Sequence, residues 1–376
     1  MKTIPSQPTD TPTAKPMLFL ALELSKASWQ LCFSDGKRIR RRRVLGGNLP
    51  AVLKEIQRCQ DKFGLESCQV HSCYEAGRDG FWIHRALWQA GIQNRVFDSA
   101  SIEVNRQRRH TKTDRVDAEK LVRLLIRIVL GGETKACAVV HVPTVEQEAQ
   151  MRLGRERERL VKEQTAHRSR IRSLVQLFGL EIKGPVDQCP VRKLKDAQGE
   201  PLSESLVAEL EREQHRLQVV MEQIASLEAE QKRQLKARQT QATAKGAKLM
   251  LLRGVGPQGA WMLPHEFFWR DFHNRKQVGA CAGLTGCPYD SGSSQREQGI
   301  TKAGSRRIRA LSIELAWNWV RFQPSSQLTQ WFVRRFGSGK RHRRVGIVAL
   351  ARKLLIALWK YLETDQWPEG AELKQR

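Results

Sequence analysis

The sequence predicts a mixed α/β protein with three folded regions, at residues 17–140, 141–245 and 246–364, between tails at 1–16 and 365–376. In the first region, apolar runs of strand length alternate with amphipathic helical segments, the pattern of an α/β domain. The second region has apolar residues at heptad spacing, and the third has helical patterns around Gly-rich turns. We therefore expect an α/β domain, a long helical hairpin or coiled coil, and a mostly α-helical domain.

The chain is strongly basic, with 65 Lys and Arg against 39 Asp and Glu and a formal net charge of +26. Such an excess favours a polyanionic partner, above all nucleic acid. A ribosome-like structural role and an anionic membrane surface are the simpler alternatives. Eight cysteines are scattered without zinc-site spacing, and no signal peptide or membrane-spanning run is recognisable. These features predict a cytoplasmic protein with reduced thiols.

The first region opens with MLFLALEL at residues 17–24, a continuous apolar run typical of a strand buried on both faces. Alternation through Trp29, Leu31 and Phe33, followed by an Asp-Gly pair, predicts a β-hairpin. A meander of three strands followed by strand–helix units predicts a sheet whose later strands are parallel. The remaining elements are expected in this order: a helix near 49–63, a strand at 69–77, a helix near 80–90, a strand at 93–98 and a helix at about 113–129.

The second region is expected to contain two long helices. Thr144 and Gln147 match a capping box that opens a helix to about residue 178, and a second helix follows a break at 184–201. Glu213 interrupts the heptad pattern of the second helix, which favours a helical hairpin or a short oligomer contact over a long fibre. The seam residues of that helix are Leu206, Leu210, Leu217, Val220, Ile224 and Leu227.

The third region begins with two helical flanks around Gly254 and Gly256. A tight Gly-rich turn before a helix exposes backbone N–H groups that can hold a phosphate. An ordinary helix–turn–helix connection explains the same pattern equally well. A Gly- and Ser-rich loop is expected at 284–305, followed by helices to about 362.

Several carboxylates stand at positions where an unpaired charge is costly. Glu23 ends the first apolar strand and Glu75 ends the strand QVHSCYE, at the sheet edge where ligands gather in open α/β folds. A salt bridge to a neighbouring arginine would account for either residue alone. Asp98, at the end of the next strand, is a further candidate for the same edge.

The segment RRHTKTDRVDAEKLVRLL, residues 108–125, places Asp114 and Asp117 three residues apart, on one face of the expected helix. That face continues through Leu121, Leu124, Leu125 and Ile128. Acids in a first helical turn also complement the helix dipole, but this does not explain their alignment with the buried face. Converging carboxylates repel each other unless a cation binds them, and oxygen ligands suit Mg²⁺ or Mn²⁺. The preceding cations are expected to hold a nucleic-acid backbone: Arg106, Arg108, Arg109 and Lys112.

The segments LALELSK, SCYEAGRDG and KTDRVDAEKL resemble the DEDD transposases of bacterial insertion sequences, specifically the insertion-sequence one-hundred-ten family. The C-terminal segments LRGVGP and GACAGLTGCPYDSGSSQREQGITKAGSRRIRALSIELAW are similar to the transposase domain of that family. Together the matches cover nearly all of residues 17–362. The resemblance implies a RuvC-like, RNase H-type fold for the first domain and a bacterial cytoplasmic setting.

The resemblance also implies that Glu23, Glu75, Asp114 and Asp117 bind Mg²⁺, and that Ser291 attacks DNA to form a covalent phosphoserine link. It implies a structured guide RNA, the bridge RNA, whose loops pair with donor and target DNA, and a homo-oligomer, a dimer or a tetramer in the synaptic complex. The usual first acid of the family is Asp. The extra methylene of Glu23 requires a compensating backbone shift of about 1 Å or more.

Ser291 has a weakly nucleophilic hydroxyl unless a base, a cation or a metal activates it. From the residues alone, Ser293, Ser294 and Ser305 would serve nearly as well, and the resemblance selects Ser291. Tyr289 is a rival, but the Arg and His set of a tyrosine recombinase is not found in order, so we expect it to support the loop. The cations expected at the scissile phosphate are Arg296, Lys302, Arg306 and Arg307.

The expected function is that of an RNA-guided DNA transposase or recombinase with a Mg²⁺ site and a phosphoserine intermediate. Two alternatives remain. A RuvC-like junction nuclease would use metal-activated water, and Ser291 would then be structural. A non-catalytic, basic nucleic-acid-binding protein would keep its acids solvated or salt-bridged.

Overall fold

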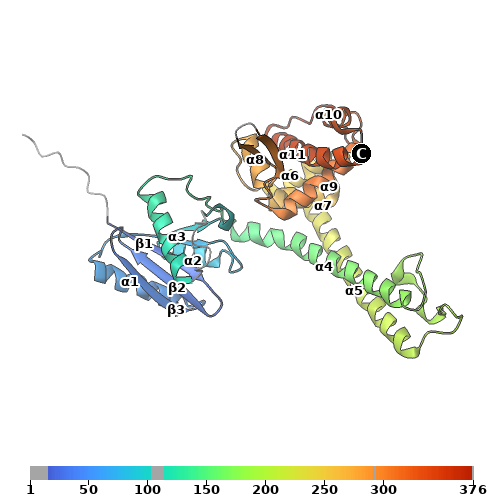
Figure 1. Cartoon of the computed structure of the whole chain (residues 1–376), viewed down its shortest axis with the longest axis horizontal. Helices are drawn as coiled ribbons and strands as arrows, with labels where there is room; N and C mark the ends of the chain where they lie inside the picture. Colours follow the sequence, from blue (N-terminus) through green and yellow to red (C-terminus); the bar gives the residue numbers. More distant parts are fainter. Residues whose placement is uncertain (1–15, 103–113, 292–293, 375–376) are drawn as a thin grey trace, which may run out of the picture. The chain divides into compact units, whose positions relative to one another are not determined.

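The computed structural model describes residues 16–102, 114–291 and 294–374, and it divides the chain into two compact units, Met1–Val142 and Pro143–Arg376 (Figure 1). Side chains are described over the same ranges except at residue 100, at 114–116 and at 290–297. Within this described part, no helix is long and apolar enough to cross a membrane.

The N-terminal unit is built on a five-stranded sheet with the order β3-β2-β1-β4-β5 (Figure 1). The first three strands form an antiparallel meander, whereas β4 runs parallel to β1 and β5 runs parallel to β4. The mixed α/β fold and the late parallel strands are thus confirmed. The strands are β1 (Met17–Leu24), β2 (Ser28–Ser34), β3 (Ile39–Leu45), β4 (Gln69–Glu75) and β5 (Gln93–Phe97).

Helices cover both faces of this sheet, because successive side chains of each strand point to opposite faces. On one face, alternate residues of β1 pack with α1 (Leu49–Phe63) and α2 (Trp82–Gln89). On the other, Phe19 and Ala21 pack with α3 (Asp114–Val129). The predicted stripe of α3 is confirmed, with Leu121, Leu125 and Ile128 buried and Leu124 partly buried. The sheet therefore fixes which residues face α3.

The C-terminal unit begins with a hairpin of two long helices, α4 (Val145–Gln176) and α5 (Glu204–Ala237). The predicted capping box is present: the Thr144 hydroxyl accepts from the Gln147 N–H at 3.1 Å, and the Gln147 amide oxygen accepts from the Thr144 N–H at 2.9 Å. The seam of α5 packs on α4 through two apolar clusters. Of the six predicted seam residues, Leu227 is partly buried and the rest are buried.

Glu213 does not destabilise this seam, because its carboxylate accepts hydrogen bonds from three basic side chains. It is 4% exposed and accepts from His167 Nδ1 at 2.6 Å, from Arg170 at 3.0 Å and from Arg216 at 2.6 Å. Burial alone would raise the pKa of Glu213, but the hydrogen bonds and charges of His167 and Arg170 outweigh it and hold the pKa below its ordinary value. The buried carboxylate therefore ties the two helices together as an ion.

Glu213→Gln is expected to lower the free energy of unfolding of the C-terminal unit by about 2 kcal/mol, because it removes a charged hydrogen-bond acceptor from His167 and from two arginines that are themselves half exposed. Thermal unfolding of the full chain followed by circular dichroism measures the loss. The matched control is Glu209→Gln, an exposed acid on the same helix, which should change stability by less than about 0.5 kcal/mol. Equal effects of the two substitutions would contradict the role assigned to Glu213.

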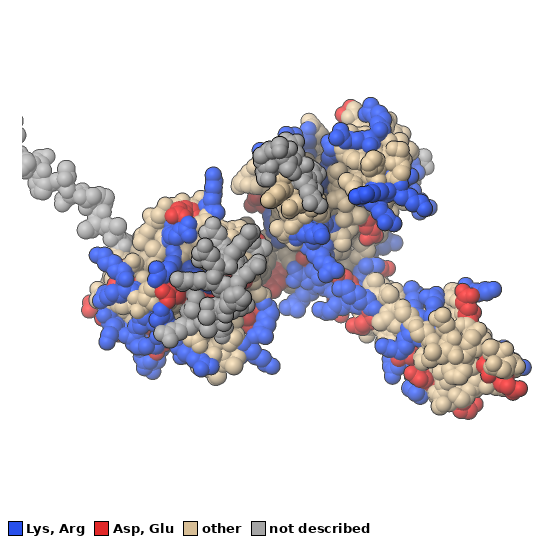
Figure 2. All heavy atoms as spheres, viewed as in Figure 1, with Lys and Arg blue, Asp and Glu red and all other residues tan. Residues whose placement is uncertain are grey.

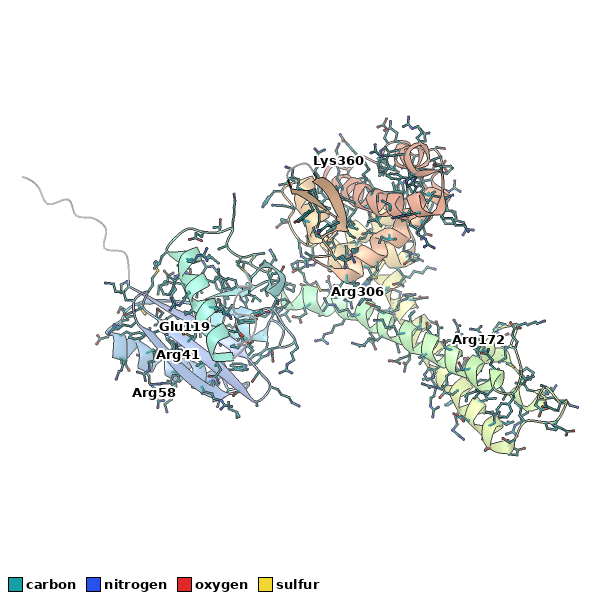
Figure 3. The ribbon with its side chains drawn as sticks, in the orientation of Figure 1. Arg41, Arg58, Glu119, Arg172, Arg306 and Lys360 are labelled. Carbon is teal, nitrogen blue, oxygen red and sulfur yellow. The ribbon has the colours of Figure 1, made fainter. Side chains whose placement is uncertain are left out.

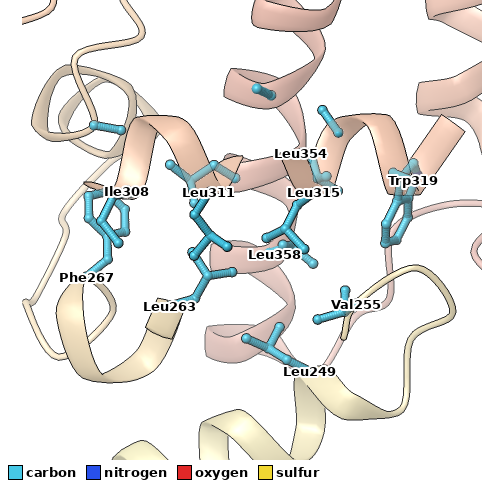
Figure 4. Close-up of a cluster of buried hydrophobic side chains, with 14 of the residues drawn as sticks. Leu249, Val255, Leu263, Phe267, Ile308, Leu311, Leu315, Trp319, Leu354 and Leu358 are labelled. Carbon is cyan, nitrogen blue, oxygen red and sulfur yellow. The ribbon is translucent and has the colours of Figure 1, made fainter. Parts of the chain in front are cut away.

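The rest of the C-terminal unit is a helical domain around one large core. Figure 4 shows the middle of this core, where buried residues of α7 and its C-cap meet those of α9 and α11: Leu263, Phe267, Ile308, Leu311, Leu315, Leu354 and Leu358. The helices are α6 (Gln241–Met250), α7 (Pro257–Glu266), α8 (Arg275–Cys281), α9 (Arg306–Phe322), α10 (Gln327–Phe336) and α11 (Lys340–Thr364). Residues beyond α11 return to this domain, since Leu373 forms a bridge with Leu252.

One expectation for this domain was wrong. The segment 284–305, expected to be a loop, contains a β-hairpin of β6 (Gly286–Ser291) and β7 (Ser294–Ile300). Its Gly and Ser residues have low strand propensity, but local propensity is a weak guide where two segments can satisfy each other's backbone hydrogen bonds. The hairpin gives the predicted nucleophile a defined position on the backbone.

Candidate acidic edge and serine hairpin

The carboxyl ends of β1 and β4 bring two predicted acids into adjacent register. Leu22 of β1 is aligned with Tyr74 of β4, so Glu23 and Glu75 are the next residues along these parallel strands. They share the sheet face of Ala21 and Cys73, which packs against α3. Glu23 is half-buried and Glu75 is exposed. The prediction that these two acids meet at one edge of the sheet agrees with this register.

Helix α3 runs from this edge toward the opposite end of the sheet. Leu130, just beyond the end of α3, approaches Gly36 in the β2–β3 turn. Earlier in the helix, Glu119 is ion-paired with Arg41 of β3 (Figure 3). The first turn of α3 therefore lies nearest the carboxyl ends of β1 and β4.

Asp117 lies close to the level of the two glutamates. The Cys73 thiol donates to the Leu121 carbonyl at 3.6 Å, which aligns these two positions. Glu75 is two residues beyond Cys73, or about 6.6 Å along the strand. Asp117 is four residues before Leu121, or about 6 Å along the helix. The two displacements match, so Asp117 belongs to the same edge of the unit as Glu23 and Glu75.

Asp98 lies beside the same edge, next to a cysteine that the sequence did not single out. Its backbone N–H donates to the Ala138 carbonyl at 2.9 Å. Burial raises the pKa of the Cys137 thiol; hydrogen bonds with the Ser101 hydroxyl and the Asp98 backbone oppose this effect, and the charges of Asp98 and Glu75 add to it. Nothing in the spacing around Cys137 could have revealed this, because residues 138–140 reach this place through long-range contacts with β5 and the residues that follow it.

The described side chains do not complete a metal site. Asp117 accepts from Lys120 at 2.9 Å, an exposed pair of the kind that contributes little to stability. Asp114 begins α3, but its side chain lies outside the described side chains. Among the side chains that are described, no three His, Cys, Asp or Glu groups are placed to hold one metal ion. The acids gathered at this edge nevertheless offer only carboxylate oxygens, a donor set that suits Mg²⁺.

The β6–β7 hairpin carries Ser291 at its turn end. Ser291 is the last residue of β6 and is aligned with Ser294 of β7, and Tyr289 is aligned with Arg296. Tyr289 is exposed, whereas the side chains of Ser291 and Arg296 lie outside the described side chains. The backbone thus places the predicted serine where a hairpin can present it to a ligand.

The cations expected to hold phosphate have different surroundings. Lys302 is exposed, as is Arg306 at the start of α9 (Figure 3). Arg307 is ion-paired with Glu158 of α4 and, at 3.3 Å, with Glu266 of α7, so it also links three helices. This structural role was missed because its partners are distant in sequence. The other predicted cations, Arg106, Arg108, Arg109 and Lys112, lie outside the described residues.

The two glycines before α7, Gly254 and Gly256, differ in backbone conformation and in the space around them. Gly254 has φ +82°, and a Cβ there would lie 3.2 Å from the carbonyl oxygen of Asn318. Close packing and a left-handed backbone therefore explain Gly254. Gly256 is the N-cap of α7, and a Cβ there would meet nothing within 4 Å. Of the two, only Gly256 leaves open space in front of the helix.

Positive charge is widely distributed over the molecule. Figure 2 shows Lys and Arg side chains over both units on the visible face, while Asp and Glu form smaller, scattered groups. This distribution follows from the net charge of +26. A diffuse basic surface of this kind attracts the backbone of a polyanion without reading its sequence.

Comparisons with known proteins point to one family. Residues 246–330 match a family described as transposase IS116/IS110/IS902. The Sinorhizobium fredii protein y4rJ, named as a transposase, is 36% identical over 98% of each chain. The Yersinia enterocolitica transposase for insertion sequence element IS1328 is 25% identical over 66% of this chain and 71% of its own length.

Proposed function

Because the chain belongs to the IS116/IS110/IS902 family of transposases, we propose that it is an RNA-guided DNA recombinase that cuts and rejoins strands through a covalent phosphoserine. The observation that carries the proposal is the adjacent register of Glu23 and Glu75 on the face covered by α3, with Asp117 at the same edge. Acids gathered in this way beside a basic surface fit metal-assisted chemistry on a phosphodiester.

The strand order of the N-terminal unit supports a RuvC-like, RNase H-type fold. Its meander of β1, β2 and β3 continues through parallel β4 and β5, with β1 in the middle of the sheet. In such a sheet the carboxyl ends of the central parallel strands form a natural ligand edge. Glu23 and Glu75 stand at that edge in this protein.

Glu23, Glu75, Asp114 and Asp117 are the residues proposed to hold Mg²⁺, with Mn²⁺ as a substitute. Bound there, the metal would supply positive charge that stabilises the developing charge on the phosphate oxygens. The role of the four residues is to hold that charge at a fixed place. Glu23 would reach it from a longer side chain than the aspartate that is usual in the family.

Ser291 is the proposed nucleophile. Its Oγ attacks the scissile phosphorus, the bond from phosphorus to the strand oxygen breaks, and the serine proton passes to the released alcohol oxygen. A hydroxyl of the other strand end then attacks the phosphoserine, and the serine oxygen recovers a proton. Each step exchanges one phosphate ester for another, so rejoining needs no external energy source.

Sequence recognition is assigned to a structured guide RNA that pairs with donor and target DNA. The diffuse positive charge supports this assignment, because a protein that holds backbones binds nucleic acid without reading bases. The proposed assembly is a homodimer that forms a tetramer with both DNA molecules. Exposed arginines on the α4–α5 hairpin, such as Arg172, are available to contact RNA or DNA (Figure 3).

The test of guidance is an exchange of the RNA loop that pairs with target DNA. Purified protein, RNA transcribed from the DNA flanking its gene, and labelled DNA are expected to give cleavage only when all three are present. Replacing the loop sequence should redirect cleavage to the newly complementary DNA. Cleavage that ignores the RNA would contradict guidance while leaving the strand chemistry intact.

A further inference from the structure

A groove of about 660 Å³ lies between α8, the base of the β6–β7 hairpin, α10 and α11. Its apolar lining includes Leu284, Ile300, Trp331, Val348 and Ile356. The volume falls within the range of about 300–1,000 Å³ typical of ligand sites. Trp331 supplies an aromatic surface, and the Lys353 ammonium lies 4.6 Å from the centre of its ring. The groove is therefore large, apolar and partly aromatic.

All the charged residues described at the rim of the groove are Lys or Arg. Among the side chains that the structure describes, neither Asp nor Glu lines it. Within the part of the chain that the structure describes, none of these rim cations is ion-paired with a carboxylate, and four of them are exposed to solvent. An occupant that filled the groove would thus meet concentrated, uncompensated positive charge. The rim residues are Arg275, Lys276, Arg344, Arg352 and Lys353.

The start of α11 adds to this charge. Its first turns contain Lys340, Arg341, Arg343 and Arg344, and its N-cap is Gly339, which has no side chain to accept from the first N–H groups. Cations near a helix N-terminus interact unfavourably with the helix dipole, and they also repel one another. A polyanion bound along the rim of the groove would relieve both effects. The charge therefore favours an anionic occupant over an apolar protein segment, which would fill the groove but leave the rim cations uncompensated.

We propose that this groove binds an unpaired base of the DNA strand being cut, with the adjoining phosphates on its cationic rim. This inference rests on the proposed function. Apolar and aromatic side chains flanked by Lys and Arg are the combination that binds single-stranded nucleic acid. A nucleotide satisfies both parts of the groove at once, because it carries a flat base and a charged phosphate.

The hairpin gives the reason for choosing DNA. Gly286 and Ile300, aligned at the base of the β6–β7 hairpin, both line the groove, and Ser291 is at the other end of β6. The five-residue separation corresponds to about 16 Å along the strand. A DNA strand lying along the hairpin would reach Ser291 with its scissile phosphate and the groove with a nearby base. Capture of that base would hold the strand in register with the nucleophile.

Trp331→Leu tests the proposal, because it keeps apolar bulk but removes the aromatic surface. The probe is fluorescein-labelled oligothymidylate, with a duplex of the same length and oligouridylate as the other arms. Trp331→Leu is expected to weaken oligothymidylate binding by about fivefold or more, the lower end for stacking one base on an aromatic side chain. Binding of the duplex should stay within about twofold, since its bases remain stacked in the helix.

A charge variant keeps the test independent of core packing. Arg344→Ala with Lys353→Ala removes two rim cations. The control, Arg334→Ala with Lys360→Ala, removes two exposed cations that do not line the groove; Lys360 is labelled in Figure 3. The rim variant should lose more affinity for oligothymidylate than the control. Unchanged melting temperatures would show that all variants fold.

Three results would overturn the inference. Losses no larger than the control's for both Trp331→Leu and the rim variant would remove the groove from strand binding. A loss confined to oligouridylate would assign the groove to RNA. A change of self-association without nucleic acid, seen by analytical ultracentrifugation, would assign it to a second protein copy. These experiments measure binding and do not depend on the phosphoserine chemistry. If the groove variants weaken DNA binding but Ser291 proves unnecessary for cleavage, only the proposed reaction is refuted, and the groove assignment stands.

Discussion

Replacing Ser291 with alanine is expected to abolish the covalent protein–DNA adduct and to lower strand exchange by at least about 10³-fold, because the attacking oxygen is removed. Binding of guide RNA should be unchanged, since the substitution removes no charge. Denaturing gel electrophoresis of labelled DNA with the purified protein and its RNA measures the adduct.

Ser294→Ala is the matched control, because Ser294 is aligned with Ser291 across the same hairpin. It is expected to keep the adduct. If Ser291→Ala still cleaves DNA at the normal rate, a junction nuclease that uses activated water becomes the better account. If the unsubstituted protein breaks no strand with any divalent ion, the non-catalytic binding role is favoured instead.

The second large effect is expected from the acidic edge. Glu75→Gln and Asp117→Asn should each lower cleavage by at least about 100-fold, because each removes one negative charge from the proposed Mg²⁺ ligands. Both should also weaken Mn²⁺ binding, which isothermal titration calorimetry measures without any DNA. The neutral amides keep the size of the side chains, so folding should be preserved.

Glu66→Gln serves as the control for these variants, because Glu66 is an exposed acid of the same unit that precedes β4 and so lies away from the carboxyl ends of β1 and β4. Its Mn²⁺ affinity and cleavage rate should match those of the unsubstituted protein. Normal cleavage by both Asp114→Asn and Asp117→Asn would show that the metal site is wrongly drawn. Glu23→Asp, which keeps the charge on a shorter side chain, then tests whether the glutamate at this position is required.

Much of the N-terminal unit was predictable because its elements have simple periodicity. The apolar run of β1 and the alternation of β2 reflect burial on two faces and the pairing of a hairpin. The adjacency of Glu23 and Glu75 also followed, since neighbouring parallel strands end at the same edge. In contrast, the β6–β7 hairpin was missed, because Gly and Ser residues resemble a loop until backbone pairing is known.

Contacts between distant segments were beyond the reach of the sequence. The approach of Cys137 to the acidic edge depends on a late segment that lies beside β5. The ion pairs of Arg307 with Glu158 and Glu266 join helices separated by long stretches of chain. Likewise, Glu213 interrupts the heptad pattern in the sequence, but in the fold it accepts hydrogen bonds from His167 and Arg170 of α4. Tertiary packing decides which partners such charged residues have, and the sequence does not show those partners.

The most direct measurement is mass spectrometry of the trapped protein–DNA adduct after protease and nuclease digestion. We expect a single modified peptide with a nucleotide attached through phosphate to Ser291. Attachment to Tyr289, or strand cleavage without any modified peptide, would contradict the phosphoserine mechanism.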